Sequence, residues 1–334
     1  LSNHGCVHRI AANEGSAIGQ AIGYFIAKKK VPVVYFQNSG ISHASNPLAS
    51  VADQKIFGIP MILLVGYRGD PKIKDEPQHY RIGPNTKKIL KSININSVIL
   101  NKRNFKSAIY KAKKRTLKLK QPQALIVSKN LISKFKNSKV INKNNKNFSY
   151  RIKYLELLAK LGSRKDFFVC TTGNTAREMY VLNEKYKKNH TNSFYCIGAM
   201  GHANQIGLEL SLQKKKKNIY ILDGDGAALM HMGNLSTIAN YKPKNLIHII
   251  FNNGVHESTG LHNTTNQKIS FKKVYDSLGY KRNFLVKKIS SFKKILKKKV
   301  TGPIGIEILI KPGTVDNLPR PNKKPKELLK LIKI

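Results

Sequence analysis

Residues 219–260 decide the fold of this chain, and they read IYILDGDGAALMHMGNLSTIANYKPKNLIHIIFNNGVHESTG. The apolar segment 219–222 predicts a strand that ends in the acidic turn 223–226. A second apolar segment, 246–251, predicts a strand that ends in the amide-rich turn 252–254. A helical segment lies between them, which makes the two strands parallel neighbours in one sheet. Both turns are therefore expected to open at the same carboxyl edge, where ligands bind in such sheets.

Two side chains of these turns, Asp225 and Asn253, are expected to converge at that edge. A carboxylate, an amide oxygen and a nearby backbone carbonyl suit a hard cation such as Mg²⁺, completed by water and ligand phosphates. Gly224 and Gly226 would let the backbone approach such a phosphate, and the helix after Gly226 would turn its N-terminal amides toward it. Ordinary strand-end turns use the same residue types, so the motif alone leaves both interpretations open.

The charge of the chain has two competing explanations. It has 334 residues, with 61 Lys+Arg against 17 Asp+Glu, a net charge of +44. This balance is typical either of a nucleic-acid or membrane-surface binder or of an enzyme with a lysine-biased surface. The basic residues are mostly lysines at the ends of apolar segments, as at 28–30 and 214–217, without an Arg-rich or aromatic stacking pattern. We therefore expect an enzyme with no nucleic-acid partner and no membrane contact.

The cysteines and the apolar segments indicate a cytoplasmic location. The three cysteines, Cys6, Cys170 and Cys196, are widely spaced, which favours a reducing compartment over a disulfide framework or a zinc site. No apolar run reaches membrane-spanning length, and we find no signal peptide.

The alternation of strand and helix patterns predicts an α/β fold with two parallel-sheet domains. The first covers residues 1–128, a basic linker rich in Lys, Asn and Ser covers 129–150, and the second domain covers 151–334. Within the first domain we expect a strand over 6–12 and a helix from Asn46 to Phe57 with Pro47 in its first turn. The chain does not start with Met, and we expect its N-terminus to be incomplete.

The Gly-Asp-Gly turn at 224–226 and the Asn-Asn pair at 252–253 together resemble the signature of thiamine-diphosphate enzymes. The segment Asn13–Ala17 is similar to the pyrimidine-domain motif of that family, in which a glutamate hydrogen-bonds the aminopyrimidine ring of the cofactor. Glu14 matches that glutamate, and a carboxylate paired with a ring nitrogen can shuttle a proton near neutral pH. Taken alone, Glu14 is better explained as an acidic residue in the first turn of a helix, and it is the motif pair of the second half that favours the cofactor role.

Further motifs point to one subfamily. In chain order they are AANEGSAIG (11–19), QNSGI (37–41), KDEPQH (74–79), TTG (171–173) with Arg177 and Glu178, MGHA (200–203) and NNGVHES (252–258). Together they resemble phosphonopyruvate decarboxylases, with sulfopyruvate decarboxylases as near relatives. Two departures matter: the family's first strand, with its Gly-Val-Pro-Asp-Ser type loop, has no counterpart before Leu1, and residues 259–264 read TGLHNT instead of a Gly-Gly-Gln-Pro-Thr type run. The second departure leaves the choice of substrate open.

The resemblance implies a pyrimidine-binding domain followed by a pyrophosphate-binding domain, with thiamine diphosphate and Mg²⁺ as cofactors. It implies that the metal is held by Asp225, Asn253 and the carbonyl of Val255. The implied cofactor-binding residues are Thr171, Thr172, Gly173, Met200, Gly224, Asp225, Gly226, Ala227 and Asn253. Met200 matches the bulky residue that wedges beneath the bent cofactor, although a core-filling methionine would look the same.

The catalytic candidates are Glu14, Met200 and His79. His79 could relay protons, because an unperturbed imidazole titrates at about pH 6.5, or it could be a plain polar loop residue. The candidates for substrate contact share a place in strand-end loops, and they are Asn38, Ser39, Asp75, Glu76, Gln78, His256 and Glu257.

The reaction that the resemblance implies is the decarboxylation of a small anionic 2-oxo acid, 3-phosphonopyruvate, to phosphonoacetaldehyde and carbon dioxide in phosphonate biosynthesis. The same chemistry on sulfopyruvate is the alternative within the family, and a basic nucleic-acid-binding protein on an α/β scaffold is the alternative of another class. The resemblance also implies a homodimer or homotetramer with sites at the subunit interface, where Glu14 of one subunit serves the cofactor held by Asp225 of its partner.

Overall fold

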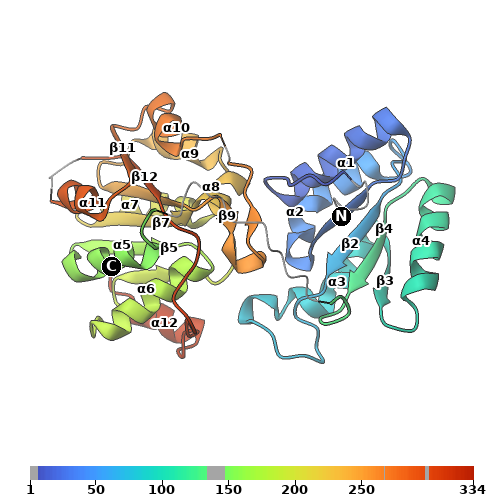
Figure 1. Ribbon diagram of the computed structural model, residues 1–334, viewed down its shortest axis with the longest axis horizontal. Coiled ribbons are helices and arrows are strands. Elements are labelled where there is room, and N and C mark those ends of the chain that lie inside the picture. The colour runs from blue at the N-terminus through green and yellow to red at the C-terminus, as the bar shows by residue number, and fades with distance from the viewer. Residues whose placement is uncertain (1–6, 134–146, 267, 298–300) are drawn as a thin grey trace. The chain divides into compact units, whose positions relative to one another are not determined.

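The computed structural model describes residues 7–133, 147–266, 268–297 and 301–334. The chain divides into two compact units, residues 1–137 and 138–334, which are described one at a time (Figure 1). The predicted linker at 129–150 includes residues 134–146, which lie outside the described part. The strand expected over 6–12 is wrong where it can be judged, since residues 7–12 form no strand and Cys6 lies outside the described residues.

The first unit is built on a four-stranded parallel sheet in the order β1, β2, β4, β3. The strands are β1 (Val33–Gln37), β2 (Ile62–Gly66), β3 (Asn96–Leu100) and β4 (Gln123–Val127), and the helices are α1 (Glu14–Lys28), α2 (Ile41–Pro47), α3 (Ile82–Ser92) and α4 (Phe105–Leu119). Successive strand residues face opposite sides of a sheet. Leu63 accordingly packs in one core with α1, α2 and α3, whereas Ile62 packs in another with α4. The first three helices thus cover one face and α4 covers the other.

The helix expected over 46–57 is wrong in its position. Helix α2 begins at Ile41, directly after a 3₁₀ turn over Asn38–Gly40, and it continues as a π-helical turn over Leu48–Ala52. Pro47 therefore lies at the end of the α-helical part, not in its first turn. Proline has no N–H for the i→i−4 ladder, and the π turn begins directly after Pro47.

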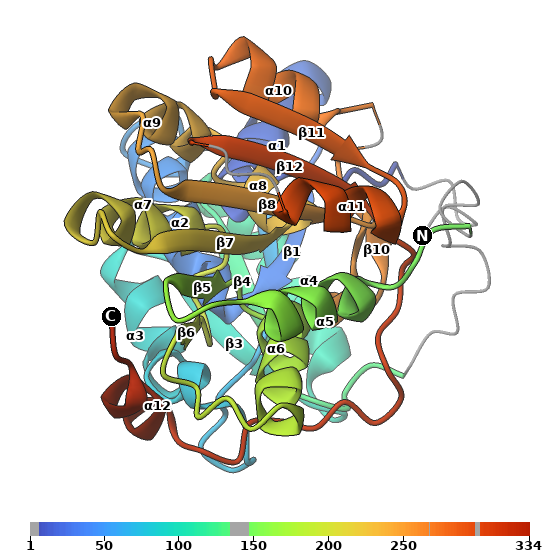
Figure 2. The same ribbon diagram turned by 90° about the vertical axis from the view of Figure 1, so that its left-hand side faces the viewer.

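The second unit holds a six-stranded parallel sheet in the order β11, β12, β8, β7, β5, β6 (Figure 2). Its strands are β5 (Asp166–Cys170), β6 (Ser193–Tyr195), β7 (Asn218–Gly224), β8 (Leu246–Asn252), β11 (Arg282–Val286) and β12 (Ile304–Leu309). Strands β7 and β8 are parallel neighbours, with Ile219 opposite Leu246 and Gly224 opposite Phe251. A short antiparallel pair, β9 (Val255–His256) and β10 (His262–Asn263), follows β8. The predicted fold class is confirmed.

Helices cover both faces of this second sheet. On one face pack α5 (Arg151–Leu161), α6 (Asn174–Lys185), α11 (Ile289–Leu296) and α12 (Pro325–Leu331), and on the other α7 (Ala203–Gln213), α8 (Asp225–Met230), α9 (Asn234–Tyr241) and α10 (Phe271–Ser277). The neighbouring residues Phe167 and Phe168 of β5 are both buried and lie in different cores, as the two-residue period of a strand requires. A sheet covered on both faces leaves its carboxyl edge as the natural place for a ligand.

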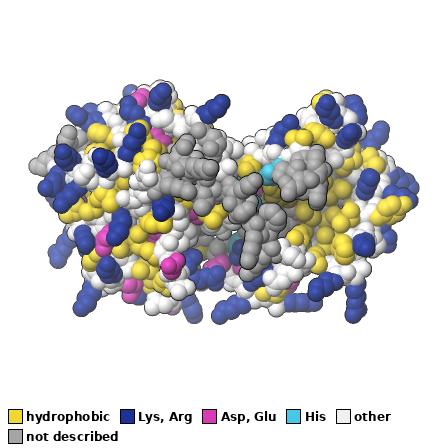
Figure 3. Space-filling view, viewed as in Figure 1, with side chains coloured by type: hydrophobic (Ala, Val, Ile, Leu, Met, Phe, Trp, Pro, Cys, Tyr) yellow, Lys and Arg dark blue, Asp and Glu magenta, His cyan; other side chains and the backbone are white. Residues whose placement is uncertain are grey.

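The basic side chains are distributed over the visible surfaces of both units (Figure 3). In the described part of the chain, no helix combines the length and apolar character that crossing a membrane requires.

Candidate active site

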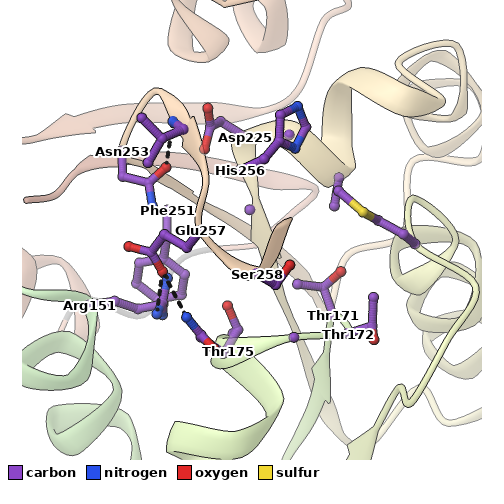
Figure 4. A pocket seen from close by; sticks show the side chains of 17 residues that line it. Arg151, Thr171, Thr172, Thr175, Asp225, Phe251, Asn253, His256, Glu257 and Ser258 are labelled. Carbon is purple, nitrogen blue, oxygen red and sulfur yellow. Dashed lines mark hydrogen bonds and ion pairs between the residues drawn. The ribbon is translucent and has the colours of Figure 1, made fainter. Parts of the chain in front are cut away.

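A pocket lies at the carboxyl edge of the six-stranded sheet, where the turns after β5, β7 and β8 meet (Figure 4). Every site residue predicted in the second half of the chain lines it: Thr171, Thr172, Gly173, Met200, Gly224, Asp225, Gly226, Ala227, Asn253, Val255, His256 and Glu257. The structure therefore brings the two turns of the opening motif together, as the parallel arrangement of β7 and β8 predicts.

Asp225 is the first residue of α8 and is 2% exposed. Its Oδ2 accepts hydrogen bonds from Thr264 Oγ1 at 2.7 Å and from Asn266 Nδ2 at 3.0 Å. Burial raises the pKa of Asp225 to about 7, although the hydrogen bond from Thr264 and the backbone N–H groups of Asn253 and Gly226 oppose this rise. A buried carboxylate of this kind is favourable in its charged form only beside a cation or further donors.

The turn after β8 fixes the side-chain amide of Asn253 beside Asp225. Asn253 Oδ1 accepts the backbone N–H of Val255 at 3.0 Å, and Gly254 takes the left-handed conformation with φ +73° that this tight turn needs. No group of three or more His, Cys, Asp or Glu side chains that could hold a metal exists in the described part of the chain. A metal held here would instead meet one carboxylate together with amide and carbonyl oxygens, which suits Mg²⁺ better than a soft transition metal.

The opposite wall of the pocket presents donors to an anion. Thr171 is 3% exposed, lines the pocket, and has a hydroxyl without a hydrogen-bond partner among the described residues. Gly173, with φ +99°, then caps the twelve-residue helix α6, whose first residues also line the pocket. An unsatisfied buried hydroxyl next to a helix N-terminus fits the oxygens of a diphosphate group. The hydroxyl of Thr172 is already used, because it donates to the Ile197 carbonyl at 2.9 Å.

The two glycines of the acidic turn, Gly224 and Gly226, differ in the space that surrounds them. A Cβ at Gly226 would lie 2.6 Å from the His256 ring, so any other residue at this position would require that imidazole to move. A Cβ at Gly224 would meet nothing within 4 Å, which agrees with open space in front of the turn.

Sequence reasoning missed five lining residues: Arg151, Asn174, Thr175, Phe251 and Ser258. Arg151, which is 5% exposed, is the only lysine or arginine among the described residues that line the pocket. It pairs with Glu178 at 2.9 Å and with Glu257 at 3.0 Å, so its charge is already offset by two carboxylates. Despite the net charge of +44, the pocket itself is thus not basic. Nothing local in the sequence marks Arg151, since its partners lie 27 and 106 positions away.

Glu257, predicted to contact substrate, has both carboxylate oxygens engaged inside the second unit. Oε2 accepts from Arg151 and from Asn174 Nδ2 at 3.2 Å, and Oε1 accepts the backbone N–H of Gly313 at 2.6 Å. Neither oxygen is left without a donor.

In the first unit, Glu14 begins α1, which Asn13 caps through a 2.8 Å hydrogen bond from the Ser16 N–H to its Oδ1. The Glu14 carboxylate lies 2.9 Å from Nδ1 of His43 on α2. A Cβ at Gly40 would overlap the Glu14 side chain, so the glycine leaves the room that this carboxylate occupies. His43 and Gly40 are contacts of Glu14 that sequence reasoning missed.

The predicted substrate residues of the first unit lie after β1 and β2, at the carboxyl edge of the four-stranded sheet. Asn38 is fully buried and holds the next loop: its Oδ1 accepts the Arg68 N–H at 3.1 Å and its Nδ2 donates to the Arg68 carbonyl at 2.7 Å. Ser39 accepts a hydrogen bond from Gln37 at 2.7 Å.

The second of these loops is held by Asp75, which accepts from Arg68 Nε at 2.8 Å and from the Gly69 N–H at 2.7 Å. The hydrogen bond from Arg68 holds the pKa of Asp75 well below its usual range. Glu76 and Gln78 flank Pro77 in the turn that ends at His79. His79 is 5% exposed, burial lowers its pKa, and its Nδ1 has no hydrogen-bond partner among the described residues.

Comparison with known proteins identifies the family. The family described as thiamine pyrophosphate enzyme, C-terminal TPP binding domain, matches residues 171–308. A phosphonopyruvate decarboxylase of Streptomyces viridochromogenes is 30% identical over 333 residues, which cover 94% of this chain and 81% of the relative. One of Streptomyces hygroscopicus is 29% identical over 98% of this chain and 84% of its own length. A sulfopyruvate decarboxylase subunit beta of Methanothermobacter thermautotrophicus is 31% identical over 45% of this chain and 77% of the relative.

The near-complete match and the pocket of the second unit agree with the motifs of the sequence. The chain therefore belongs to the phosphonopyruvate decarboxylase family of thiamine-diphosphate-dependent decarboxylases.

Proposed function

We propose that this protein catalyses the thiamine-diphosphate- and Mg²⁺-dependent decarboxylation of 3-phosphonopyruvate to phosphonoacetaldehyde and carbon dioxide, in phosphonate biosynthesis. The observation that carries the proposal is the pocket of the second unit, which places the buried carboxylate of Asp225 and the Asn253 turn opposite the unpartnered hydroxyl of Thr171. This arrangement can hold a metal on one side and a diphosphate on the other.

In this proposal Asp225, Asn253 and the Val255 carbonyl hold Mg²⁺, while the Thr171 hydroxyl and the first N–H groups of α6 bind diphosphate oxygens. The charge of Arg151 is already neutralised, so a diphosphate finds no free cationic side chain among the described lining residues. The metal must then supply the positive charge that balances the diphosphate. Binding of the metal and binding of the cofactor should therefore depend on each other. Thiamine diphosphate, when bound, supplies the electron sink for the electron pair that carbon dioxide leaves behind.

Glu14 is proposed to hold and move the proton on the pyrimidine nitrogen of the cofactor. The cap at Asn13 and the contact with His43 fix where its carboxylate lies within the first unit. Met200 is proposed to support the cofactor from below and His79 to move a proton in the substrate region. We further propose a homodimer or homotetramer with sites between subunits, in the cytoplasm. That relatives are named as subunits alpha and beta of sulfopyruvate decarboxylase supports an assembly of more than one chain.

Phosphonopyruvate is favoured over sulfopyruvate by the extent of the matches. The relatives named phosphonopyruvate decarboxylase match 94% and 98% of this chain, whereas those named sulfopyruvate decarboxylase match between 26% and 53% of it. The test is carbon dioxide release by the purified protein from phosphonopyruvate, sulfopyruvate and pyruvate, at equal concentrations with saturating cofactor. Phosphonopyruvate should give the highest kcat/KM; a preference for sulfopyruvate would establish the alternative, and equal turnover of pyruvate would refute both.

Cofactor binding is tested without any substrate. Thiamine diphosphate with Mg²⁺ should raise the melting temperature, since a ligand at 100 times its Kd stabilises the native state by about 2.7 kcal/mol, and EDTA should remove this effect. The alternative of a basic nucleic-acid-binding protein gains no support from the family match. It predicts no such stabilisation and binding to DNA or RNA that weakens steeply with salt.

A further inference from the structure

The two walls of the pocket come from strands that are not neighbours. The wall with Thr171 follows β5, the wall with Val255 follows β8, and β7 lies between these strands in the sheet. Glu257 connects the two walls directly, because its Oε2 accepts a hydrogen bond from Nδ2 of Asn174, the first residue of α6, at 3.2 Å. The turn that follows β8 and the first residue of α6 are thereby linked through one carboxylate.

Arg151 strengthens the link between the two walls by binding Glu257. Both of its Nη atoms donate to Glu257 Oε2 at 3.0 Å, while its Nε and Nη2 donate to the two oxygens of Glu178 at 2.9 and 3.0 Å. Glu178 is fully buried and also accepts from Thr314 Oγ1 at 2.6 Å. A planar guanidinium held by two carboxylates has its orientation fixed, so the position of Glu257 is fixed as well.

Stability alone is a poor reason for this network. Two carboxylates share one guanidinium, and apolar residues of similar volume often replace buried ion pairs without loss of stability. Arg151, Asn174 and Glu257 all line the pocket and form a rigid polar connection between its two walls. Apolar residues could not reproduce this connection.

We propose that Glu257 is a positioning residue: together with Arg151 and Asn174 it sets the spacing between the metal-holding turn and the diphosphate-binding wall. Glu257 would therefore affect the reaction by shaping the cofactor site and not by contacting the substrate. The inference rests on the proposed binding of thiamine diphosphate and Mg²⁺ in this pocket.

The Glu257→Gln substitution is the sharpest test of this role. Glu257 accepts hydrogen bonds at both oxygens, from Arg151 and Asn174 at one and from the Gly313 N–H at the other. A glutamine has nearly the same size but one acceptor oxygen, so its NH₂ group must face a donor on one side. The Glu257→Gln variant should therefore weaken the connection between the two walls of the pocket, while the volume of the side chain stays nearly the same.

The experiment is a calorimetric titration of thiamine diphosphate at saturating Mg²⁺, below the melting temperature of every variant. E257Q should raise the Kd at least tenfold, and its kcat should recover when the cofactor is saturating. The matched control is Glu156→Gln on α5, because Glu156 pairs with Lys185 at 3.2 Å and is not a lining residue. This control should bind the cofactor as the wild type does.

An E257Q variant that is folded and binds the cofactor within twofold of the wild type would overturn the inference. So would an unchanged cofactor Kd combined with a raised KM for the substrate, which is the signature of direct substrate contact. If E257Q does not fold, Asn174→Ala removes one hydrogen bond of the link, and its cofactor Kd should rise several-fold; an unchanged value overturns the inference.

The outcomes separate this inference from the proposed function. A wild-type protein that binds the cofactor, shows the E257Q loss and leaves phosphonopyruvate unchanged refutes the substrate and supports the positioning role. A wild-type protein that binds no thiamine diphosphate overturns the positioning role.

Discussion

Replacing Gly40 by alanine should lower the turnover rate without lowering the stability of the fold. Gly40 has φ −83° and ψ −5°, a conformation that alanine adopts freely, and such a replacement typically stabilises a protein by about 0.4–1 kcal/mol through the unfolded state. The added Cβ would nevertheless lie closer than 3.0 Å to the Cγ, Cδ and Oε1 atoms of Glu14. Because carbon atoms pack at about 3.5–4.0 Å, the carboxylate must move by about 1 Å and lose its contact with His43.

We expect the kcat for carbon dioxide release to fall about 100-fold in Gly40→Ala, because a misplacement of about 1 Å in a reacting group can cost that much. This corresponds to about 2.7 kcal/mol of transition-state stabilisation. The melting temperature, followed by circular dichroism, should stay close to that of the wild type. The matched control is Gly19→Ala on the same helix as Glu14, where a Cβ meets nothing within 4 Å, and it should keep the wild-type kcat. A G40A variant with wild-type kcat would show that the position of Glu14 seen here does not matter for turnover.

Three further predictions follow from single side chains. Glu14→Gln should abolish turnover, measured as carbon dioxide release, while Mg²⁺-dependent stabilisation by thiamine diphosphate persists; retained activity would remove Glu14 from its role. Thr171→Val should leave the cofactor-free protein at least as stable, because the hydroxyl has no described partner, yet raise the calorimetric Kd of thiamine diphosphate. The pKa of Asp75 is lowered by the hydrogen bond from Arg68, so its stabilising effect is present above the unfolded pKa of about 3.9 and is lost as the pH falls toward the folded value. The difference in unfolding free energy between wild type and Asp75→Asn, from urea titrations, should therefore narrow below about pH 4, and a constant difference would contradict the assignment.

The meeting of Asp225 and Asn253 could be predicted because it depends only on local patterns and one topological rule. Apolar runs mark β7 and β8, a helix between them makes the strands parallel, and parallel neighbours end at the same edge. Helix α2 could not be placed in the same way. Its sequence pattern predicted a start at Asn46, whereas Ile41 and Ala44 pack in the core and the helix begins at Ile41.

The amino-acid sequence by itself determined the fold class, the family and which polar residues stand at the strand ends, because these depend on residue types and periodicities within short segments. Only the tertiary structure decided which partners the buried charges take. Arg151 meets Glu178 and Glu257 across 27 and 106 positions, and Gly40 makes room for Glu14 between two different elements. Such pairings are chosen by how whole elements pack and by the need to satisfy every buried donor and acceptor, and no local pattern records that choice.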